Sequence, residues 1–505
     1  MTRFSLMLVV AVIAAATATA ANVDYQGAGG NLNTPASWYL ISDPSKPASR
    51  TGVTRLPDYG DYALIRNSTT GTINFTLNTM QLLVGGPEIT GVATKPVTTT
   101  YITDGATITA RRRTSPIDPD EGRIVIGAFY DGALNMSGGS IHIQGALSSE
   151  LILSENSGAT GTFNMSGGLI NIANVGAGAY FTGAEGDGRI AVFNMSGGTI
   201  LANNTPSPSR TVRFGVGGGQ AEVTLSGGRL YNGAMTEIGG GPDTSRGRLT
   251  QTGGSMECGY RFLIGEDSGY GHYRLLGGTL VAGGGMWLGR FKSAETEPGA
   301  FMGRGKMTLG QNAVITGTSG IWMGISPTGE ARSPDHTAME LKIGSDADFN
   351  NTLTNVDLTG QLEVSFINGY TPAPGTDWRL FSTTAGAAVD FQQISAGFRT
   401  EVRGNGLDVY VICDAVRHPG DANNDGGVNV GDLGILAANW NQPDFFGKSW
   451  ETGDFTGDDV VNVGDLGVLA ANWGWTGAPA ASVPEPASLV LLGLGALAML
   501  RRSRR

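Results

Sequence analysis

The 505-residue sequence predicts a mostly β fold, a parallel β-helix or solenoid with β caps, followed by a small α-helical module. Three observations indicate this class. Glycine is frequent, at 80 residues, and glycine pairs recur every 24 to 30 residues through the middle of the chain. The residues beside the pairs alternate between apolar and polar, as half-buried strands do. Near the C-terminus the apolar spacing becomes that of helices with one apolar face.

The repeated unit is a short strand that ends in a glycine pair. Residues 163–168 read F-N-M-S-G-G and recur as residues 193–198. Each copy also has an apolar residue two positions after its pair. The first glycines are Gly138, Gly167, Gly197, Gly227, Gly253 and Gly277, and the apolar residues are Ile141, Ile170, Ile200, Leu230, Met256 and Leu280. A weaker seventh copy spans residues 307–314, with Gln311 and Asn312 in place of the glycines.

A second apolar strand precedes most copies, for example at residues 124–127 and 262–265. Because one copy cannot bury its own apolar face, the copies have to stack. Copies of this length, with two or three strands each, fit one coil of a parallel β-helix; the alternative is a β-propeller, whose blades are usually about 40–50 residues long. We place the repeats at residues 121–337, between an N-terminal β cap at 21–120 and a C-terminal β cap at 338–414.

The tripeptide Asn-Met-Ser occurs in three of the copies, beginning at Asn135, Asn164 and Asn194. It matches the sequence that accepts N-linked glycans. The alternative is structural: asparagine and serine are the outward residues of a repeated strand, and stacked asparagines can bond to each other. We favour the structural interpretation.

Two 12-residue stretches, 421–432 and 454–465, carry oxygen-bearing side chains at positions 1, 3, 5, 9 and 12. This spacing suits calcium, which takes six to eight oxygen ligands at about 2.3–2.6 Å. The second stretch begins 33 residues after the first, so the unit is duplicated. The predicted calcium site residues are Asp421, Asn423, Asp425, Gly427, Asn429 and Asp432 in the first loop, and Asp454, Thr456, Asp458, Val460, Asn462 and Asp465 in the second.

Each loop is followed by an apolar pattern with helical spacing. The positions are Leu433, Leu436, Ala437 and Trp440 after the first loop, and Leu466, Leu469, Ala470 and Trp473 after the second. We therefore expect two short helices that pack on each other and bury both tryptophan rings.

Residues 418–475 resemble the duplicated loop-helix of type I dockerins, down to aspartate at position 12 of both loops. The resemblance implies calcium as the cofactor and a cohesin-like domain as a partner. The second loop departs from the pattern at Thr456 and at Asp459, where the first loop has Gly426, so we expect the first loop to bind more tightly. The residue pairs at positions 10 and 11, which help to choose the cohesin, are Val-Gly rather than the polar pair of cellulosomal dockerins.

The N-terminus has the three parts of a secretory signal peptide, which we place at residues 1–20. Arg3 supplies the positive charge, residues 4–16 are almost wholly apolar, and residues 18–20 read Ala-Thr-Ala before the cleavage point. The alternative is a retained membrane anchor, but the apolar stretch is shorter than the roughly 20 residues that a spanning helix needs.

The C-terminal segment, residues 476–505, contains a linker, the triplet Pro484-Glu485-Pro486, an apolar stretch at 487–500 and four arginines. This order is similar to the PEP-CTERM sorting signal. The resemblance implies transient insertion of the tail in the inner membrane and its removal by an exosortase; a simple C-terminal anchor is the alternative. With these ends, the layout of the whole chain resembles exported repeat proteins of planctomycete-like bacteria. We expect the protein at the cell surface or outside the cell.

The net charge and the cysteine content argue against some classes of protein. The net charge is −11, with no basic cluster of the kind that nucleic acid requires. The two cysteines, Cys258 and Cys413, are too few for a disulfide-dense fold. We expect a non-enzymatic structural or adhesive protein associated with extracellular polysaccharide.

Two other functions stay open. One is a β-helix carbohydrate-active enzyme, a polysaccharide lyase or glycoside hydrolase, and the other is a scaffold protein that docks to a cohesin-like receptor. The candidate catalytic side chains form small clusters, but no cluster recurs in register beside a second charged cluster, as a β-helix enzyme would need. We therefore interpret them as residues of solvated loops. They are Asp118, Asp120, Glu121, Glu185, Asp187, Glu266, Asp267 and His272.

Overall fold

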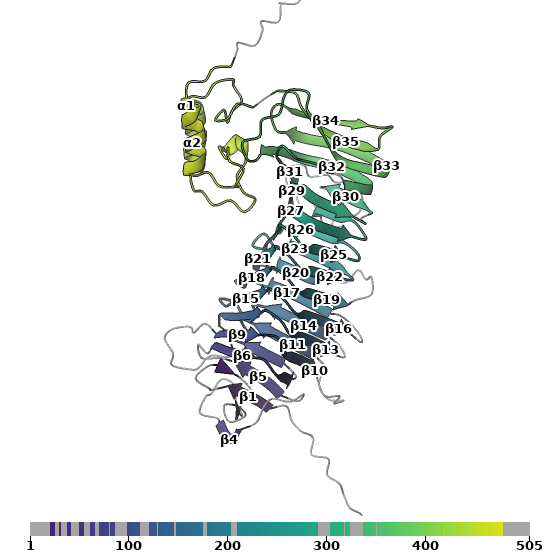
Figure 1. Ribbon diagram of the computed structural model, residues 1–505, viewed down its shortest axis with the longest axis vertical. Coiled ribbons are helices and arrows are strands. Elements are labelled where there is room, and N and C mark those ends of the chain that lie inside the picture. Colours follow the sequence, from purple (N-terminus) through teal and green to yellow (C-terminus); the bar gives the residue numbers. More distant parts are fainter. Residues whose placement is uncertain are drawn as a thin grey trace, which may run out of the picture.

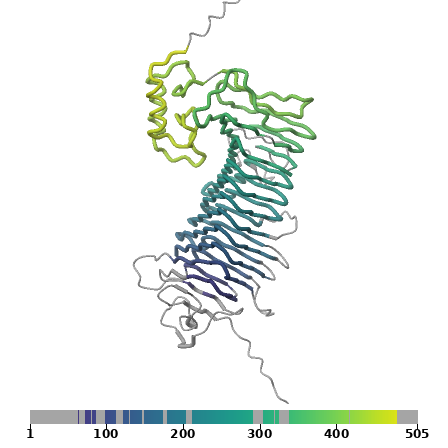
Figure 2. The backbone as a smooth tube through the Cα atoms, viewed as in Figure 1, coloured from purple at the N-terminus to yellow at the C-terminus, as the bar shows by residue number. Residues whose placement is uncertain are grey.

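The computed structural model shows a long rod of stacked β-strands with two short helices beside its C-terminal end (Figures 1 and 2). The residues described are 21–25, 30–31, 38–41, 50–54, 61–65, 70–79, 81–85, 98–111, 121–128, 130–145, 148–174, 179–203, 210–290, 303–317, 319–323, 337–349, 351–415 and 417–477. The predicted signal peptide and nearly all of the C-terminal sorting segment therefore lie outside them. Within these ranges no helix is both long and apolar enough to cross a membrane.

Three parallel stacks of strands form the sides of the rod. The first contains β6 (Thr70–Ile73), β9 (Thr98–Ile102), β12 (Gly132–Met136), β15 (Thr160–Met165), β18 (Ile190–Met195), β21 (Gln220–Leu225), β24 (Arg246–Gln251), β27 (Tyr270–Ala282), β29 (Arg304–Thr316), β31 (Thr337–Ile343) and β32 (Asn351–Phe366). The second contains β7 (Thr76–Thr79), β10 (Thr107–Arg111), β13 (Ser140–Gly145), β16 (Leu169–Asn174), β19 (Thr199–Asn203), β22 (Arg229–Asn232) and β25 (Ser255–Cys258), and then the second halves of β27 and β29.

The third stack contains β5 (Asp61–Ile65), β8 (Gln81–Val84), β11 (Glu121–Ile126), β14 (Ser148–Leu153), β17 (Ala179–Glu185), β20 (Arg210–Val216), β23 (Met235–Gly241), β26 (Phe262–Asp267), β28 (Met286–Arg290) and β30 (Gly320–Met323). At the N-terminal end, β1 (Ala21–Tyr25) adds to β5, β2 (Gly30–Asn31) adds to β6, and β3 (Trp38–Ile41) and β4 (Arg50–Thr54) pair antiparallel. Parallel pairing thus begins well before residue 121, inside the region we predicted as a cap.

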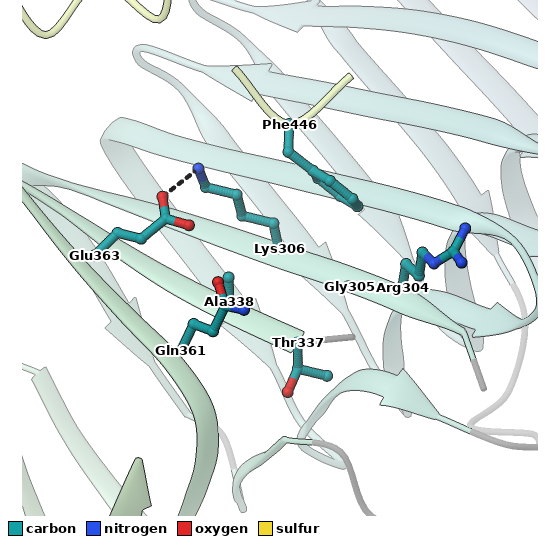
Figure 3. A pocket seen from close by; sticks show the side chains of 8 residues that line it. All are labelled: Arg304, Gly305, Lys306, Thr337, Ala338, Gln361, Glu363 and Phe446. Atoms are coloured by element: carbon teal, nitrogen blue, oxygen red, sulfur yellow. Dashed lines mark hydrogen bonds and ion pairs between the residues drawn. The ribbon is translucent and has the colours of Figure 1, made fainter. Parts of the chain in front are cut away.

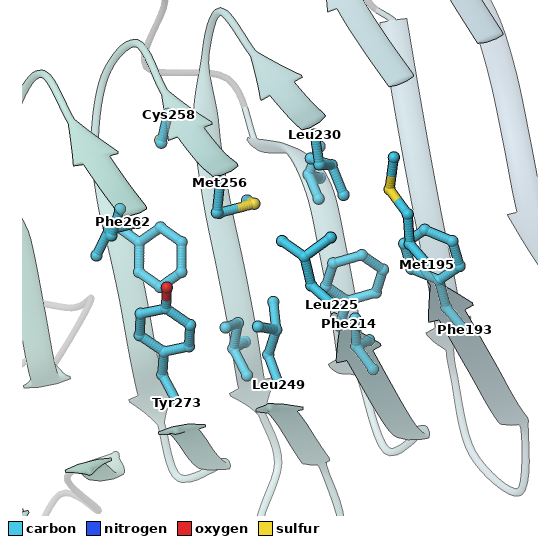
Figure 4. Packing of buried hydrophobic residues seen from close by; sticks show 14 of the residues in the cluster. Phe193, Met195, Phe214, Leu225, Leu230, Leu249, Met256, Cys258, Phe262 and Tyr273 are labelled. Carbon is cyan, nitrogen blue, oxygen red and sulfur yellow. The ribbon is translucent and has the colours of Figure 1, made fainter. Parts of the chain in front are cut away.

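The parallel solenoid predicted from the repeats is confirmed, and the copies lie in register. Phe163 is paired with Leu134 in one neighbouring coil and with Phe193 in the other. The rings of Phe163 and Phe193 stack with centroids 5.3 Å apart. Figure 4 shows the inward residues of successive coils meeting in one continuous core. Each coil therefore covers the apolar face of the next.

The glycine pairs turn the chain between the first and second stacks. The second glycine of each pair has a positive φ, for example +88° at Gly168 and +84° at Gly198, a backbone conformation that other residues adopt at a cost. The first glycine lies against the coil below, because a Cβ on Gly167 would come within 2.3 Å of the Ser137 carbonyl oxygen. The pair is thus required both for the turn and for the close approach of coils.

The seventh copy does not follow the predicted alignment. A register shift falls between Leu275 and Gly277 of β27, and the glycine pair is matched by Asn312 and Ala313 of β29 rather than by Gln311 and Asn312. The inward residue is consequently Ile315, which is buried, whereas Val314 is exposed. One extra residue in β29 causes this shift, because a bulge moves every later side chain by one position.

The C-terminal end of the rod is closed by antiparallel strands. β33 (Asp377–Ile394) pairs in parallel with β32 but antiparallel with β35 (Asp408–Cys413), which also pairs antiparallel with β34 (Phe398–Arg403). Asn368 and Gly369 turn the chain before β33, with φ values of +56° and +69°. Both cysteines are buried and free.

The C-terminal module contains α1 (Val430–Asn439), the short 3₁₀ helix η4 (Trp450–Thr452) and α2 (Val463–Ala471). The two predicted helices are confirmed, and Leu436 and Leu469 meet in one core. The expected burial of both tryptophans is wrong: Trp440 is half-buried and Trp473 is 52% exposed. Each lies just beyond the last helical residue, so helical spacing no longer sets its direction. Trp450 fills the core instead, with its indole N–H donated to the Asp421 carbonyl at 2.8 Å.

We predict that Phe193→Ala destabilises the solenoid by about 3–5 kcal/mol, because the cavity left in a core between stacked coils cannot collapse fully. Ile190→Ala is the matched control in the same strand; Ile190 is 43% exposed, and its replacement should change stability by about 0.5 kcal/mol or less. Urea unfolding followed by circular dichroism measures both. Equal effects of the two substitutions would contradict the buried aromatic stack.

Candidate functional site

The two acidic loops of the module have the same local structure. In the first loop, Asp432 accepts hydrogen bonds from the backbone N–H groups of Ala422 at 2.8 Å and Asn429 at 2.9 Å. In the second, Asp465 accepts from Phe455 and Asn462, both at 2.8 Å. The position-1 aspartates, Asp421 and Asp454, accept from the backbone of positions 5 and 6 in each loop. The duplication seen in the sequence is therefore a duplication of geometry.

Positions 9 and 12 of each loop also begin a helix. Asn429 caps α1 by accepting the Gly431 N–H at 2.7 Å, and Asn462 caps α2 by accepting the Gly464 N–H at 2.7 Å. The position-12 aspartates complete capping boxes. These four side chains thus tie the loops to the helices, whatever the loops bind.

Three carboxylates converge in the second loop. The nearest oxygens of Asp454, Asp458 and Asp465 all lie within 4.8 Å of one another. Asp454 and Asp465 are buried, and Asp458 is exposed to solvent. Burial raises the pKa of Asp454 to about 6, and it also raises the pKa of Asp421 in the first loop. Carboxylates gathered in this way fit a hard cation, which would offset their mutual repulsion.

The remaining predicted ligand positions lie on the same loops. Asn423 and Asp425 are exposed, and Asn423 donates its amide to Asp425 at 2.9 Å. The Thr456 hydroxyl lies 3.1 Å from an Asp465 oxygen. Gly427 and Val460, at position 7, offer backbone carbonyls rather than side chains. The structure therefore places all twelve predicted residues in two compact loops.

A second cluster, which the sequence did not reveal, lies on the outward face of the first stack where the module covers it. Lys306 pairs with Glu340 at 3.1 Å and with Glu363 at 2.7 Å, and Lys342 pairs with Glu340 at 2.8 Å. Figure 3 shows the Lys306–Glu363 pair beside Phe446, which comes from the module. Glu340 is completely buried and both lysines are nearly so, whereas the Glu363 side chain is 22% exposed.

The charges in this second cluster depend on each other. Burial alone would raise the pKa of Glu340, but Lys306 and Lys342 hold it well below its usual range. Burial raises the pKa of Glu363, although Lys306 lies beside it. Burial and the nearby Lys306 lower the pKa of His272, which is therefore neutral near pH 7.

For His272 and Glu266 the prediction of a solvated loop is wrong, because both side chains are buried within strands. His272 lies in β27, is 1% exposed, and makes a hydrogen bond at 2.9 Å with the hydroxyl of Thr308, which donates to Glu340 at 3.0 Å. The ring of Phe446 covers it. Glu266 is buried within β26, where Gly265, at a φ of +67°, interrupts the alternation of inward and outward residues.

The other candidate catalytic residues are dispersed. Glu121 begins β11, Glu185 ends β17 and pairs with Arg213, and Asp267 ends β26, so these three lie at strand ends rather than in the predicted loops. Asp187 lies in the turn that follows β17. Asp118 and Asp120 lie outside the described residues. The cluster around Glu340 contains deeply buried ionisable side chains, and the module covers it. Its members become neighbours only through the register of β27, β29, β31 and β32, so a correct alignment of these strands would have predicted the cluster. A more exposed set lies on the third stack, where Arg123 pairs with Glu150 and Glu155, and Arg213 pairs with Glu185 and Glu237.

A shallow groove of about 290 Å³ follows the asparagine positions of β12, β15 and β18. The Asn164 amide donates to the Asn135 side-chain oxygen at 2.8 Å, and the Asn194 amide donates to Asn164 at 2.8 Å. This confirms the predicted hydrogen bonding along the stack. The serines that follow each methionine line the same groove, with Tyr101 at one end. The result is a row of small polar groups repeated at the coil spacing, about 4.8 Å.

Comparison with known proteins identifies one segment of the chain. Residues 482–505 match the PEP-CTERM protein-sorting motif. The motif indicates an exported protein that an exosortase sorts to the cell surface. No curated protein and no solved structure matches the chain. The likeness of residues 418–475 to dockerins therefore stays a resemblance.

We predict that Glu340→Gln destabilises the protein by about 3 kcal/mol at pH 7, because it leaves two buried lysines short of a partner. The folded-state pKa of Glu340 lies below its ordinary value near 4.5, so its contribution is full above that pH and declines as the pH falls. The difference from wild type should shrink by roughly 2 kcal/mol between pH 7 and pH 3. Urea unfolding at both pH values measures it.

Glu401→Gln is the control for this prediction, since Glu401 pairs with Arg399 and Arg403 at the solvent-exposed surface of the cap. Its loss should leave stability nearly unchanged. A Glu340→Gln effect that is equally large at pH 3 would show that the substitution acts through packing and not through charge.

Proposed function

We propose that this exported β-solenoid is a structural or adhesive protein of the cell surface or extracellular matrix, and that it binds polysaccharide along the groove of Asn135, Asn164 and Asn194. The observation that supports this function is the ladder of amides. Asn164 uses one N–H and its oxygen toward its neighbours, while Asn135 uses its oxygen and Asn194 one N–H, and each keeps further donor and acceptor capacity for a ligand. A polymer with regularly spaced hydroxyl groups matches such a row better than a single small substrate does.

The groove suits multivalent binding, in which many weak contacts with one polymer act together. Ser137, Ser166 and Ser196 supply hydroxyl groups beside the amides. Tyr101, which is 41% exposed, offers an aromatic face at the end of the row. Because the coils repeat the same groups, a longer polymer engages more of them, and its overall affinity rises through effective concentration.

We predict that replacing Asn135, Asn164 and Asn194 together with alanine lowers polysaccharide affinity by at least about tenfold, since each hydrogen bond to a ligand contributes about 1 kcal/mol. The matched control is His142→Ala with Asn171→Ala, at outward positions of β13 and β16 in the second stack. A glycan array with neutral and uronate-containing polysaccharides, followed by titration of the best ligand, measures the change.

Three outcomes would count against this function. They are no binding to any polysaccharide, equal losses in both variants, and shortening of a uronate-containing polymer by the purified protein. The last outcome would favour the alternative, a carbohydrate-active enzyme, especially if alanine at Glu266, Asp267 or His272 abolished the shortening.

We also propose that the two loops of the module bind calcium. The support is the shared geometry of the loops and the convergence of Asp454, Asp458 and Asp465. Bound calcium would supply positive charge at the centre of each loop. Asp421 and Asp454 would then hold the start of the loop to its end, at Asp432 and Asp465, and so stabilise the helix that follows.

We predict two calcium ions per chain, with Asp425→Ala removing one site and Asp458→Ala removing the other. These residues occupy position 5 of the first and second loops, so the variants are matched to each other. Asp444→Asn, an acidic residue between the loops, should leave both sites intact. Isothermal titration calorimetry of the intact chain measures the stoichiometry, and the absence of calcium binding would refute the proposal.

A second candidate function, docking to a cohesin-like receptor, is favoured by two exposed valines. Val430 and Val463 occupy position 10 of the two loops and are 73% and 74% exposed. Large apolar side chains so open to solvent often mark a protein-binding surface. This surface lies on the module and the asparagine groove lies on the solenoid, so the two functions are compatible.

A further inference from the structure

We propose that the second loop of the module is a calcium-dependent latch, which binds the outward face of β27 and β31 through Asp459 and holds the module against the solenoid. This inference rests on the proposed binding of calcium by that loop. It adds an internal docking site, with the loop as its ligand, to the functions proposed above.

The contact is made by both the side chain and the backbone of the loop. One Asp459 carboxylate oxygen lies 2.9 Å from the Lys342 ammonium, and the other pairs with the guanidinium of Arg274. The Lys342 ammonium also donates to the Gly457 carbonyl at 3.0 Å. Lys342 is buried together with its other partner, Glu340. The loop thus completes an ion-pair network that begins inside the solenoid face.

The two loops differ at the position that makes this contact. Position 6 is Gly426 in the first loop and Asp459 in the second, and both have a positive φ, +84° and +72°. This conformation suits glycine and is strained for aspartate. A Cβ on Gly426 would meet nothing within 4 Å, so the first loop has no neighbour there. The strain at Asp459 is offset by its contacts with Lys342 and Arg274, which only the second loop makes.

The segment between the two helices adds an aromatic contact to the latch. The Phe446 ring lies 5.8 Å from the ring of Tyr270 and 5.9 Å from that of His272. Arg248 donates to the Phe445 carbonyl. This segment is also tied to the loop, since the Lys448 N–H donates to the Asp459 carbonyl at 3.0 Å. Asp459 therefore positions the aromatic contact as well as the ion pairs.

The proposed calcium ligands lie on both sides of Asp459 in the loop, with Asp458 before it and Val460 after it. The Asp459 N–H donates to Asp454 at 2.8 Å. When Asp454, Asp458 and Asp465 are held around one cation, the backbone of Asp459 is fixed and its carboxylate points at the solenoid. Without the cation these carboxylates repel each other, and the loop loses the geometry that the latch needs. Binding of calcium and docking of the module must then strengthen each other, because the coupling is reciprocal.

Hydrogen exchange of β27 and β31 in the intact chain tests the latch, with calcium and with a chelator. In wild type, calcium should slow exchange of these strands by about tenfold relative to the chelator. Asp458→Ala should abolish this protection, whereas Asp425→Ala, at the same position of the first loop, should preserve it. Asp459→Gly, which installs the residue of the first loop, should expose the strands even with calcium.

A second variant changes the solenoid side of the contact and leaves the loop itself unchanged. Arg274→Ala should weaken calcium binding at the second site by roughly 5–150-fold through reciprocity. Calorimetry of Asp425→Ala and of the double variant with Arg274→Ala isolates that site. If Asp425→Ala binds no calcium, the proposed calcium function fails and the calcium dependence of the latch fails with it. If calcium binds but neither exchange nor affinity responds to Asp459→Gly or Arg274→Ala, the latch alone is overturned.

Discussion

The structure depends on one constraint: no coil of the solenoid can bury its apolar face without a neighbour in parallel register. That constraint places like residues on top of one another, so that Phe163 stacks on Phe193 and Asn164 bonds to both Asn135 and Asn194. The inward stacks supply the core, and the outward stacks create rows of identical polar groups. The stability of the rod and its proposed binding surface therefore come from the same repetition.

The repeats made the solenoid predictable, and they also set the limit of the prediction. Where the glycine pairs persist, the sequence alignment gives the true register, as at Phe163 and Phe193. After Gly278 the pairs disappear and β29 gains a residue, so alignment by sequence fails by one position at Gln311. The charged cluster of Lys306, Glu340 and Glu363 lies in this part of the chain. Its members are separated by coils of unequal length, and only the strand register shows that they are neighbours.

The module was predictable for a different reason, because loop spacing and helix capping are local. Asn429 and Asn462 begin the helices where the pattern of the sequence places them. The positions of the tryptophans were not predictable in this way. Trp440 and Trp473 follow the helical spacing in sequence, but the helices end before them, and the core is completed by Trp450 from the connecting segment. Which side chain fills a small core is decided by the whole module and not by one helix.

Asp459 belongs to the local structure of the second loop and also contacts the stacked strands of the solenoid. In the sequence it is a departure from the loop pattern, and taken alone it weakens the second loop by placing an aspartate at a positive φ. In the structure its carboxylate meets Arg274 of β27 and Lys342 of β31, two cations that the stacking of the coils on either side of β29 brings within its reach. Without Asp459, the buried Lys342 would have Glu340 as its acidic partner, and Glu340 also pairs with Lys306. A local departure that is costly within the module is thus stabilised by the solenoid, and Asp459 becomes one of the residues that link the two parts of the chain.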